Sequence, residues 1–419
     1  MVGRETIPIL RFTTIFSFLV RFSCLPNNSC LVAELTRVYA PTVQSTTKQI
    51  NLMKPQPTKN QQILLGSRPS GEATLDHFQL TETEIPKPGL GQMLLRTIYL
   101  SLDPYMRGRM NAGPSYAAPV EIGKVMSGQS VCEVVESNLP NYYPGDIILA
   151  ATGWQEFSLS SGDGTQKVDR SIGSISYALG VLGMPGFTAY AGLLNIGKPR
   201  PGETVVVAAA SGAVGSVAGQ IAKIKGCRVV GIAGGQQKCR FVTEELGFDA
   251  CLDHREPGLG ENLKAACPEG IDVYFENVGG PIFDAVSPLL NNFARIPVCG
   301  LIAHYNAAKS PPGQDRLPLL MRAILSKRLS FRGFIYFDYA SQFPDFVSDM
   351  KAWLAEGRIK YREDITDGLE NAPRELIRLL KGENFGKKII RVSPDPTAAK
   401  QYIADQSDER PRSTDSATP

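Results

Sequence analysis

The feature that most constrains this chain is an apolar strand that leads directly into a glycine turn and a helix of small residues. TVVVAA at 204–209 predicts a strand buried on both faces of a parallel sheet. In SGAVGSVAGQIAK, which follows, Gly212 and Gly215 let a ligand approach the backbone, and a helix over 213–225 is expected to stop at Gly226. The start of such a helix offers unpaired N–H groups that favour a pyrophosphate. Because the pattern is G-x-x-G, its position between strand and helix, more than its spacing, indicates a dinucleotide site over a mere tight turn.

Strands and helical patterns alternate through the second half of the chain. Further strands are predicted at 227–234, 249–253, 271–277, 295–300 and 329–335. Residues 61–180 instead read as short strands separated by turns, and KKIIRV at 387–392 returns to β character. We therefore predict an α/β protein with two domains. Residues 61–184 together with 346–393 form a β-rich domain, and residues 185–345 form a doubly wound parallel-sheet domain.

The two ends of the chain differ from this body. Residues 1–60 contain the apolar stretch IPILRFTTIFSFLVRFSCL, which Arg11 and Arg21 interrupt, so it falls short of the roughly 20 residues of a transmembrane helix. This segment can be interpreted as a secretory signal, as a mitochondrial transit peptide, or as a dispensable or misassigned leader. We favour the dispensable or misassigned leader, because every recognisable motif follows residue 60. Residues 394–419 are polar and rich in Pro, Ser and Asp, and are expected to be a disordered tail.

Charge and cysteine content exclude several function classes. The formal net charge is +3, too small to indicate a nucleic-acid or acidic-membrane partner. The eight cysteines are scattered without a C-x-x-C pair, which argues against a zinc ribbon or a thioredoxin-type motif. We interpret them as buried or half-buried thiols in a reducing compartment. A cytoplasmic location follows, with a mitochondrial one as the alternative if the leader is genuine.

The end of the second parallel strand indicates which coenzyme binds. Sites selective for NAD place Asp or Glu there, but this chain has Gly234 and Gly235, followed by Lys238 and Arg240. A carboxylate would repel a 2′-phosphate, whereas two glycines leave room and an ammonium pairs with it. We therefore predict NADPH over NADH. The alternative, a solvated surface charge, is credible for Arg240 and less so for Lys238.

The chain lacks the residues of a zinc-dependent dehydrogenase. Its three histidines, His77, His254 and His304, are not paired with cysteines at ligand spacing, so no metal is expected. Hydride transfer without a metal needs hydrogen-bond donors for the substrate oxygen, and tyrosine hydroxyls suit this role. Tyr305 follows the fifth strand and is the first candidate; Tyr105 in LSLDPYMRGRM is the second, with a core aromatic as its alternative.

Several motifs in order resemble a known family. These are LSLDPYMRGRM, LGMPGFTAYAGLL, VVVAAASGAVGSVAGQIAKIKGCRVVGIAGG, FENVGG, ARIPVCGLIAHYN and ENFGKKIIRV, spread over residues 61–393. Together they resemble the zinc-independent medium-chain dehydrogenase/reductases, in the branch of prostaglandin, leukotriene and curcumin reductases. The resemblance implies a GroES-like β-rich domain, a Rossmann domain, NADPH as coenzyme and a homodimer. It also implies reduction of the carbon–carbon double bond of α,β-unsaturated ketones or aldehydes.

The same resemblance implies a set of coenzyme contacts. The expected residues are Ser211, Gly212, Ala213, Val214, Gly215, Gly234, Lys238, His254, Asn277, Cys299, Gly300, Tyr305, Asn306, Phe334 and Asn384. The turn at 212–215 would hold the pyrophosphate, Lys238 the 2′-phosphate, and Cys299 to Asn306 the nicotinamide half. His254 stands where the family has a tyrosine, which leaves the adenosine-phosphate contact there open.

The activity expected is NADPH-dependent reduction of an enone or enal, with Tyr305 and Tyr105 as candidate catalytic residues. One rival is one-electron quinone reduction, and another is a protein that binds NADPH without turnover. The substrate itself is not predicted, because the pocket is expected to be lined by the variable loops 111–120 and 307–317.

Overall fold

A computed structural model describes residues 17–21, 34–38, 58–113, 115–307 and 315–398. The chain divides into two units, Met1–Pro57 and Thr58–Pro419. In the first unit, strand β1 (Ser17–Arg21) pairs antiparallel with β2 (Glu34–Val38). The rest of the predicted leader up to residue 57 and the tail from residue 399 lie outside the described residues. No helix in the described ranges is long and apolar enough to cross a membrane.

A six-stranded parallel sheet forms the centre of the second half of the chain. Its strands are β10 (Thr204–Ala208), β11 (Arg228–Ala233), β12 (Ala250–Asp253), β13 (Ile271–Phe275), β14 (Leu290–Val298) and β15 (Ser330–Gly333). They pair in the order β12-β11-β10-β13-β14-β15, and every pair is parallel. This order is that of the doubly wound dinucleotide-binding fold, whose ligands bind where the strand order reverses, between β10 and β13.

Helices cover both faces of this sheet, because alternate side chains of β10 enter two different cores. Val205 and Val207 pack with α2 (Met184–Ala191), α3 (Gly215–Ile224) and α8 (Phe343–Ala355). Val206 and Ala208 pack on the opposite face with α5 (Leu259–Ala266), α6 (Gly280–Val286) and α7 (Leu317–Lys327). The predicted Rossmann fold is confirmed. Pro281 lies at the start of α6, where its missing N–H costs nothing.

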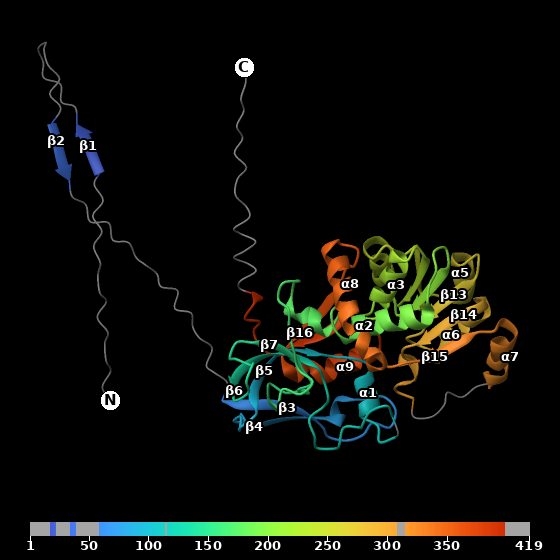
Figure 1. The fold of residues 1–419 in the computed structure, drawn as a ribbon, viewed down its shortest axis with the longest axis horizontal. Coiled ribbons are helices and arrows are strands. Elements are labelled where there is room, and N and C mark those ends of the chain that lie inside the picture. Colours follow the sequence, from blue (N-terminus) through green and yellow to red (C-terminus); the bar gives the residue numbers. More distant parts are fainter. Residues whose placement is uncertain (1–16, 22–33, 39–57, 114, 308–314, 399–419) are drawn as a thin grey trace, which may run out of the picture. The chain divides into compact units, whose positions relative to one another are not determined.

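A second, mostly antiparallel sheet joins both ends of the body. Its path is β16-β17-β5-β6-β7-β9, with β8 paired to β5. The strands are β5 (Met93–Ser101), β6 (Ser130–Ser137), β7 (Ile147–Ala150), β8 (Phe157–Ser160), β9 (Gln166–Lys167), β16 (Glu363–Asp367) and β17 (Lys387–Arg391). Figure 1 shows β16 among strands from the first part of the chain, and β17 pairs directly with β5. The predicted β-rich part is therefore built from segments far apart in the sequence.

The remaining elements lie around these sheets. They are the hairpin β3 (Lys59–Leu65) with β4 (Phe78–Glu84), the short helix α1 (Tyr105–Arg109), and the helices α4 (Gln236–Arg240) and α9 (Ala372–Leu380). β3 begins before the predicted end of the leader at residue 60, and Asn60 is buried.

Two predicted helices begin later than the sequence pattern indicated. α3 starts at Gly215 rather than 213, because the two preceding residues belong to the glycine turn. The segment 339–358, predicted as one helix, contains a break: Tyr339 has non-helical φ and ψ, and α8 starts at Phe343. Phe346 of α8 lies in the same core as α3, so the boundary predicted at 345/346 falls inside a helix. The exact limits of the two domains stay predictions.

The glycines of α3 allow the helix to approach its neighbours closely, which generates a test. An ideal Cβ on Gly219 would lie 1.8 Å from Cζ of the buried Phe248. We expect Gly219→Ala to lower the free energy of unfolding by about 1–3 kcal/mol, because overpacking forces the ring to move. Gly260 in α5 has open space around its Cβ, so Gly260→Ala is expected to leave stability unchanged or raise it. Thermal midpoints measure both, and equal midpoints for the two variants would contradict the packing argument.

Candidate active site

The glycine turn after β10 leaves no space for larger side chains. An ideal Cβ on Gly215 would lie 2.3 Å from the carbonyl oxygen of Ala209, and one on Gly212 would lie 3.2 Å from it. Within the described chain, the N–H groups of Ala213 and Val214 have no hydrogen-bond acceptor. They lie just before the first turn of α3, so this turn presents free donors that fit a pyrophosphate. The residues predicted for this contact, Gly212, Ala213, Val214 and Gly215, form the turn, and Ser211, another predicted coenzyme residue, directly precedes it.

Two glycines lie against basic side chains where β11 ends. Gly235 has a φ of 98° and donates its N–H to Oδ1 of Asp253 over 2.9 Å. An ideal Cβ on Gly234 would lie 2.9 Å from Nε2 of His254 and 3.1 Å from Nε of Arg255. The pKa of His254 is lowered, first by burial and then by the charge of Arg255. The predicted residues Gly234 and His254 are thus neighbours, and Arg255, which the sequence analysis missed, lies beside them.

Lys238, on α4, is the second cation at this end of the site. Its Nζ donates to the carbonyl oxygen of Gly382 over 2.7 Å. Burial lowers the pKa of Lys238, and the charge of Arg255 lowers it further. Lys238 is half-buried and Arg255 is exposed, and two cations whose charges oppose each other in this way favour an anion near both. Arg240 is exposed on α4, in agreement with its interpretation as a solvated surface charge.

Glu276 organises the backbone that follows β13. Its Oε1 accepts the N–H groups of Val278 and Gly279 over 2.7 and 2.8 Å, and the hydroxyl of Tyr274 over 3.0 Å. Its carbonyl oxygen accepts the N–H of Cys299 over 2.9 Å. Burial raises the pKa of the Glu276 carboxyl, and the bonds from the backbone oppose this rise. Sequence reasoning did not single out this residue, although FENVGG contains it.

Asn277 connects the carboxyl ends of β10 and β13. Its Nδ2 donates to the carbonyl oxygen of Ala208 over 2.8 Å, and its own carbonyl oxygen accepts the N–H of Ile302 over 3.2 Å. Gly300 donates to the carbonyl oxygen of Glu276 over 3.2 Å. The loop after β14 is therefore held against the point where the strand order reverses. The predicted residues Asn277, Cys299 and Gly300 belong to this one arrangement.

Tyr305 and Asn306 end that loop and point to different partners. The Tyr305 hydroxyl accepts the N–H of Leu301 over 3.4 Å. Oδ1 of Asn306 accepts Nε of Arg107 over 3.0 Å, and the same buried guanidinium donates to the carbonyl oxygen of Gly71 over 2.6 Å. Arg107 therefore joins the loop after β14 to α1 and to the segment between β3 and β4.

Further tyrosines gather near Tyr305. The pKa of Tyr305 is raised mainly by burial, with smaller contributions from Cys299 and Tyr116. Tyr105 and Tyr336 likewise have raised pKa values, mainly because of burial. The guanidinium carbon of Arg109 lies 5.6 Å from the Tyr105 ring centre and 4.7 Å from that of Tyr116. Tyr116 lies in the loop 111–120 that was expected to line the pocket, whereas Tyr336 was not foreseen.

Two predicted coenzyme residues, Phe334 and Asn384, have side chains that contact other parts of the protein. Phe334 is buried in the core beside α2, where an ideal Cβ on Gly192 would lie 2.3 Å from its Cζ. Only the backbone of Phe334 is therefore available to a ligand. Nδ2 of Asn384 donates to the carbonyl oxygen of Gly386 over 2.8 Å, within the loop that also contacts Lys238.

Metal donors do not gather in the part of the chain that the structure describes. No group of three or more His, Cys, Asp or Glu side chains is placed to hold an ion there. His77 accepts the N–H of Thr74 through Nδ1 over 3.0 Å, and the ring of His304 lies beside Gly279. His254, as described above, faces Gly234.

Comparisons with known proteins agree with this geometry. Two family models match, "N-terminal domain of oxidoreductase" over residues 61–168 and "Zinc-binding dehydrogenase" over residues 213–352. The described residues offer no donor set for the zinc that the second description names. The NADPH-dependent curcumin reductase of Escherichia coli (strain K12) is 58% identical over 344 residues, which is 82% of this chain and 100% of that protein.

Two more proteins extend the similarity. The 2-alkenal reductase (NADP(+)-dependent) of Nicotiana tabacum is 38% identical over 341 residues, covering 80% of this chain and 98% of that protein. The crystal structure of CurA in complex with NADPH from Vibrio vulnificus superposes with a TM-score of 0.78 at 54% identity, covering 80% of this chain and 100% of that one. The chain therefore belongs to the zinc-independent branch of the medium-chain dehydrogenase/reductases, together with the curcumin and alkenal reductases.

Proposed function

We propose that this protein is an NADPH-dependent reductase of the carbon–carbon double bond of α,β-unsaturated ketones and aldehydes. The observation that carries the proposal is that the parallel sheet has two regions suited to the two halves of the coenzyme. A basic, glycine-lined end lies at β11 and β12, and a tyrosine-lined end lies after β14. The names of the relatives, which include a curcumin reductase and a 2-alkenal reductase, support the same class of reaction. The substrate is proposed as a small molecule.

The residues present fit the coenzyme from one end to the other. The amides before α3 would hold its pyrophosphate, since no side chain obstructs the turn. Lys238 and Arg255 would hold the 2′-phosphate, with His254 beside them. The loop from Cys299 to Asn306, held by Glu276, would face the nicotinamide half. When bound, NADPH supplies the hydride that the reduction needs.

The contribution of the chain to the chemistry is a hydrogen bond to the carbonyl oxygen. The Tyr305 hydroxyl accepts a bond from Leu301, and its own hydrogen has no acceptor in the described residues. A tyrosine hydroxyl is protonated at neutral pH, and burial raises the pKa of Tyr305 further, so it can donate to an oxygen on which negative charge develops. Tyr105 is the second donor we propose, for the same reason. Neither role requires a metal ion.

The direct test is a panel of simple enones, enals and quinones assayed with NADPH and NADH in parallel. We expect NADPH-dependent loss of the alkene, and the same rate in the presence of a chelator. Semiquinone formation with no turnover of any enone would favour the quinone reductase. Tight NADPH binding with no turnover of any acceptor would favour the non-catalytic protein.

The tyrosine roles are tested by removing one hydroxyl at a time. Tyr305→Phe is expected to lower kcat for an enone by about a hundredfold, because it removes a donor that acts as charge develops. The KM for NADPH should change by less than about twofold, since the ring remains. Tyr143→Phe removes an exposed hydroxyl and serves as the control. Wild-type kcat in both Tyr305→Phe and Tyr105→Phe would contradict these roles while leaving the reductase activity itself intact.

We also propose that two copies of the chain form a homodimer. Among the described strands β15 lies at the edge of the parallel sheet, and its outer side has no partner there, so it can bond to a second copy related by a two-fold axis. α7, which directly precedes it, has no buried residue and exposes large apolar side chains. These are Leu317, Leu319, Met321 and Leu325. An apolar face of this kind beside an open strand edge suits a symmetric protein interface.

A charge placed on α7 tests the dimer. Leu325, 80% exposed, has few contacts within its own chain, so Leu325→Lys should leave the fold intact and weaken association. Light scattering after size-exclusion chromatography is expected to report a dimer for the wild type and a larger monomer fraction for this variant. Leu90→Lys, at a fully exposed leucine elsewhere, is the control. A wild-type protein that is monomeric at every concentration would refute the proposal.

The cysteines support an expected cytoplasmic location. The six cysteines of the described residues are free thiols, as predicted, and four of them are buried. Cys24 and Cys30 lie outside the described residues. Free thiols are typical of reducing compartments, and we propose the cytoplasm on this ground.

A further inference from the structure

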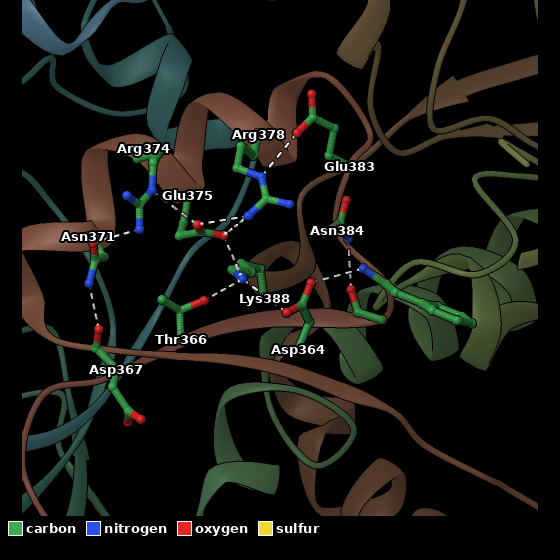
Figure 2. A network of polar contacts seen from close by, with 12 residues as sticks. Asp364, Thr366, Asp367, Asn371, Arg374, Glu375, Arg378, Glu383, Asn384 and Lys388 are labelled. Atoms are coloured by element: carbon green, nitrogen blue, oxygen red, sulfur yellow. Dashed lines mark hydrogen bonds and ion pairs between the residues drawn. The ribbon is translucent and has the colours of Figure 1, made fainter. Parts of the chain in front are cut away.

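A buried ion-pair network lies between α9 and the strands β16 and β17, and Figure 2 shows Lys388 at its centre. The side chains of Lys388 and Glu375 are each 3% exposed. Nζ of Lys388 lies 2.6 Å from Oε2 of Glu375, 2.9 Å from Oδ1 of Asp364 and 2.8 Å from Oγ1 of Thr366. An ammonium has three hydrogens, and all three therefore have acceptors. The three acceptors therefore fix the orientation of the Lys388 ammonium.

Through Asp364 this network holds the loop 382–386, which joins α9 to β17. Oδ2 of Asp364 accepts the N–H of Phe385 over 3.0 Å, while Oδ1 accepts Lys388. Gly386 has a φ of 92°, and an ideal Cβ on it would lie 2.3 Å from the carbonyl oxygen of Arg362. The loop is thus tied to β16 at its far end, in a conformation that favours glycine.

The other end of the loop is tied to α9. Nε of Arg378 donates to Oε2 of Glu383 over 3.0 Å, and its Nη1 donates to Oε1 of Glu375 over 3.1 Å. Figure 2 shows these side chains in one continuous chain of contacts from Glu383 to Lys388. Lys388 therefore contributes to both anchors of the loop, through Asp364 at one end and through Glu375 at the other.

The loop in turn contacts the segment that carries Lys238. The carbonyl oxygen of Gly382 accepts Nζ of Lys238 over 2.7 Å. The ring of Phe385 meets the ring of Phe241, which directly follows α4, at a centroid distance of 5.1 Å and an interplanar angle of 89°. The guanidinium carbon of Arg362 lies 4.0 Å from the Phe385 centroid. The loop thus braces α4 at the lysine side chain and just beyond its last residue.

The ammonium of a lysine sits at the end of a flexible four-carbon chain, so in solvent it moves freely. In Lys238, one of the three ammonium hydrogens is bonded to the carbonyl oxygen of Gly382, which restricts where the other two can point. We propose that Lys388 is a positioning residue for recognition of the 2′-phosphate: it fixes the loop 382–386, and this loop fixes the ammonium of Lys238. Lys388 itself does not touch the coenzyme. The inference rests on the proposed coenzyme site.

The test compares coenzymes in the full-length protein with one simple enone as acceptor. For Lys388→Met we expect the KM for NADPH to rise about tenfold, while the KM for NADH and both kcat values change by less than about twofold. A merely structural role would affect the two coenzymes alike. Lys360→Met, at an exposed lysine outside the network, is the matched control and should behave as the wild type.

A second variant guards against simple misfolding, because Lys388→Met leaves Glu375 buried without its partner. The double variant Lys388→Met/Glu375→Met replaces the buried pair by apolar side chains of similar volume, a change that proteins often tolerate. It still releases Asp364 from Lys388, so the NADPH-specific rise in KM is expected to persist at a wild-type thermal midpoint. A double variant with that midpoint and an unchanged KM for NADPH would overturn the proposal, as would equal rises for both coenzymes.

Lys238→Met separates this inference from the function on which it rests. If Lys238 binds the 2′-phosphate, this variant loses the preference for NADPH directly. A wild type without any preference would refute the coenzyme site itself, and a Lys238→Met variant that keeps the preference would refute the contact of Lys238 with the 2′-phosphate. A normal response to Lys238→Met with no response to the double variant would refute only the role of Lys388.

Discussion

The whole site depends on how closely the backbone of β10 approaches its neighbours. At Gly215 a single added carbon would collide with the carbonyl oxygen of Ala209, so the turn exists only because this position has no side chain. The same strand end accepts the Asn277 amide at Ala208. The ends of two parallel strands, β10 and β13, are thereby joined through the Asn277 amide. Free donors then collect where the strand order reverses, which is where a nucleotide binds in such folds.

This part of the structure could be predicted from the sequence because its causes are local. A buried strand, a pair of glycines and a small-residue helix follow one another within about twenty residues, and each acts on its immediate neighbours. The substitution of Gly234 and Gly235 for an acidic residue is equally local. The strand order also follows from the alternation of strands and helices, since parallel connections are nearly always right-handed. The resemblance to a family then supplied residues, such as Asn384, that no spacing rule would have selected.

What escaped the sequence are residues whose roles depend on distant partners. Glu276 looks like any acidic residue at a strand end until the fold buries it against the N–H groups of the next turn. Arg255 becomes part of the site only because β12 lies beside β11. The contact between Lys238 and Gly382 joins residues 144 positions apart. Periodicity and propensity describe near neighbours along the chain, so they carry no signal for such pairs.

The buried pair of Lys388 and Glu375 illustrates what such a distant contact provides in return for the desolvation of its charges. Removing two charges from water costs several kcal/mol each, and apolar residues of the same volume would often stabilise the fold as well or better. Apolar contacts, however, have no preferred direction, whereas three short bonds from one ammonium do. A loop that only packs can shift along its neighbour, while this loop cannot shift without breaking the bond from the Phe385 N–H to Asp364 and the ion pair between Glu383 and Arg378. The role proposed for Lys238 depends on where its charge lies, so for that role direction matters more than the added stability that an apolar pair would give.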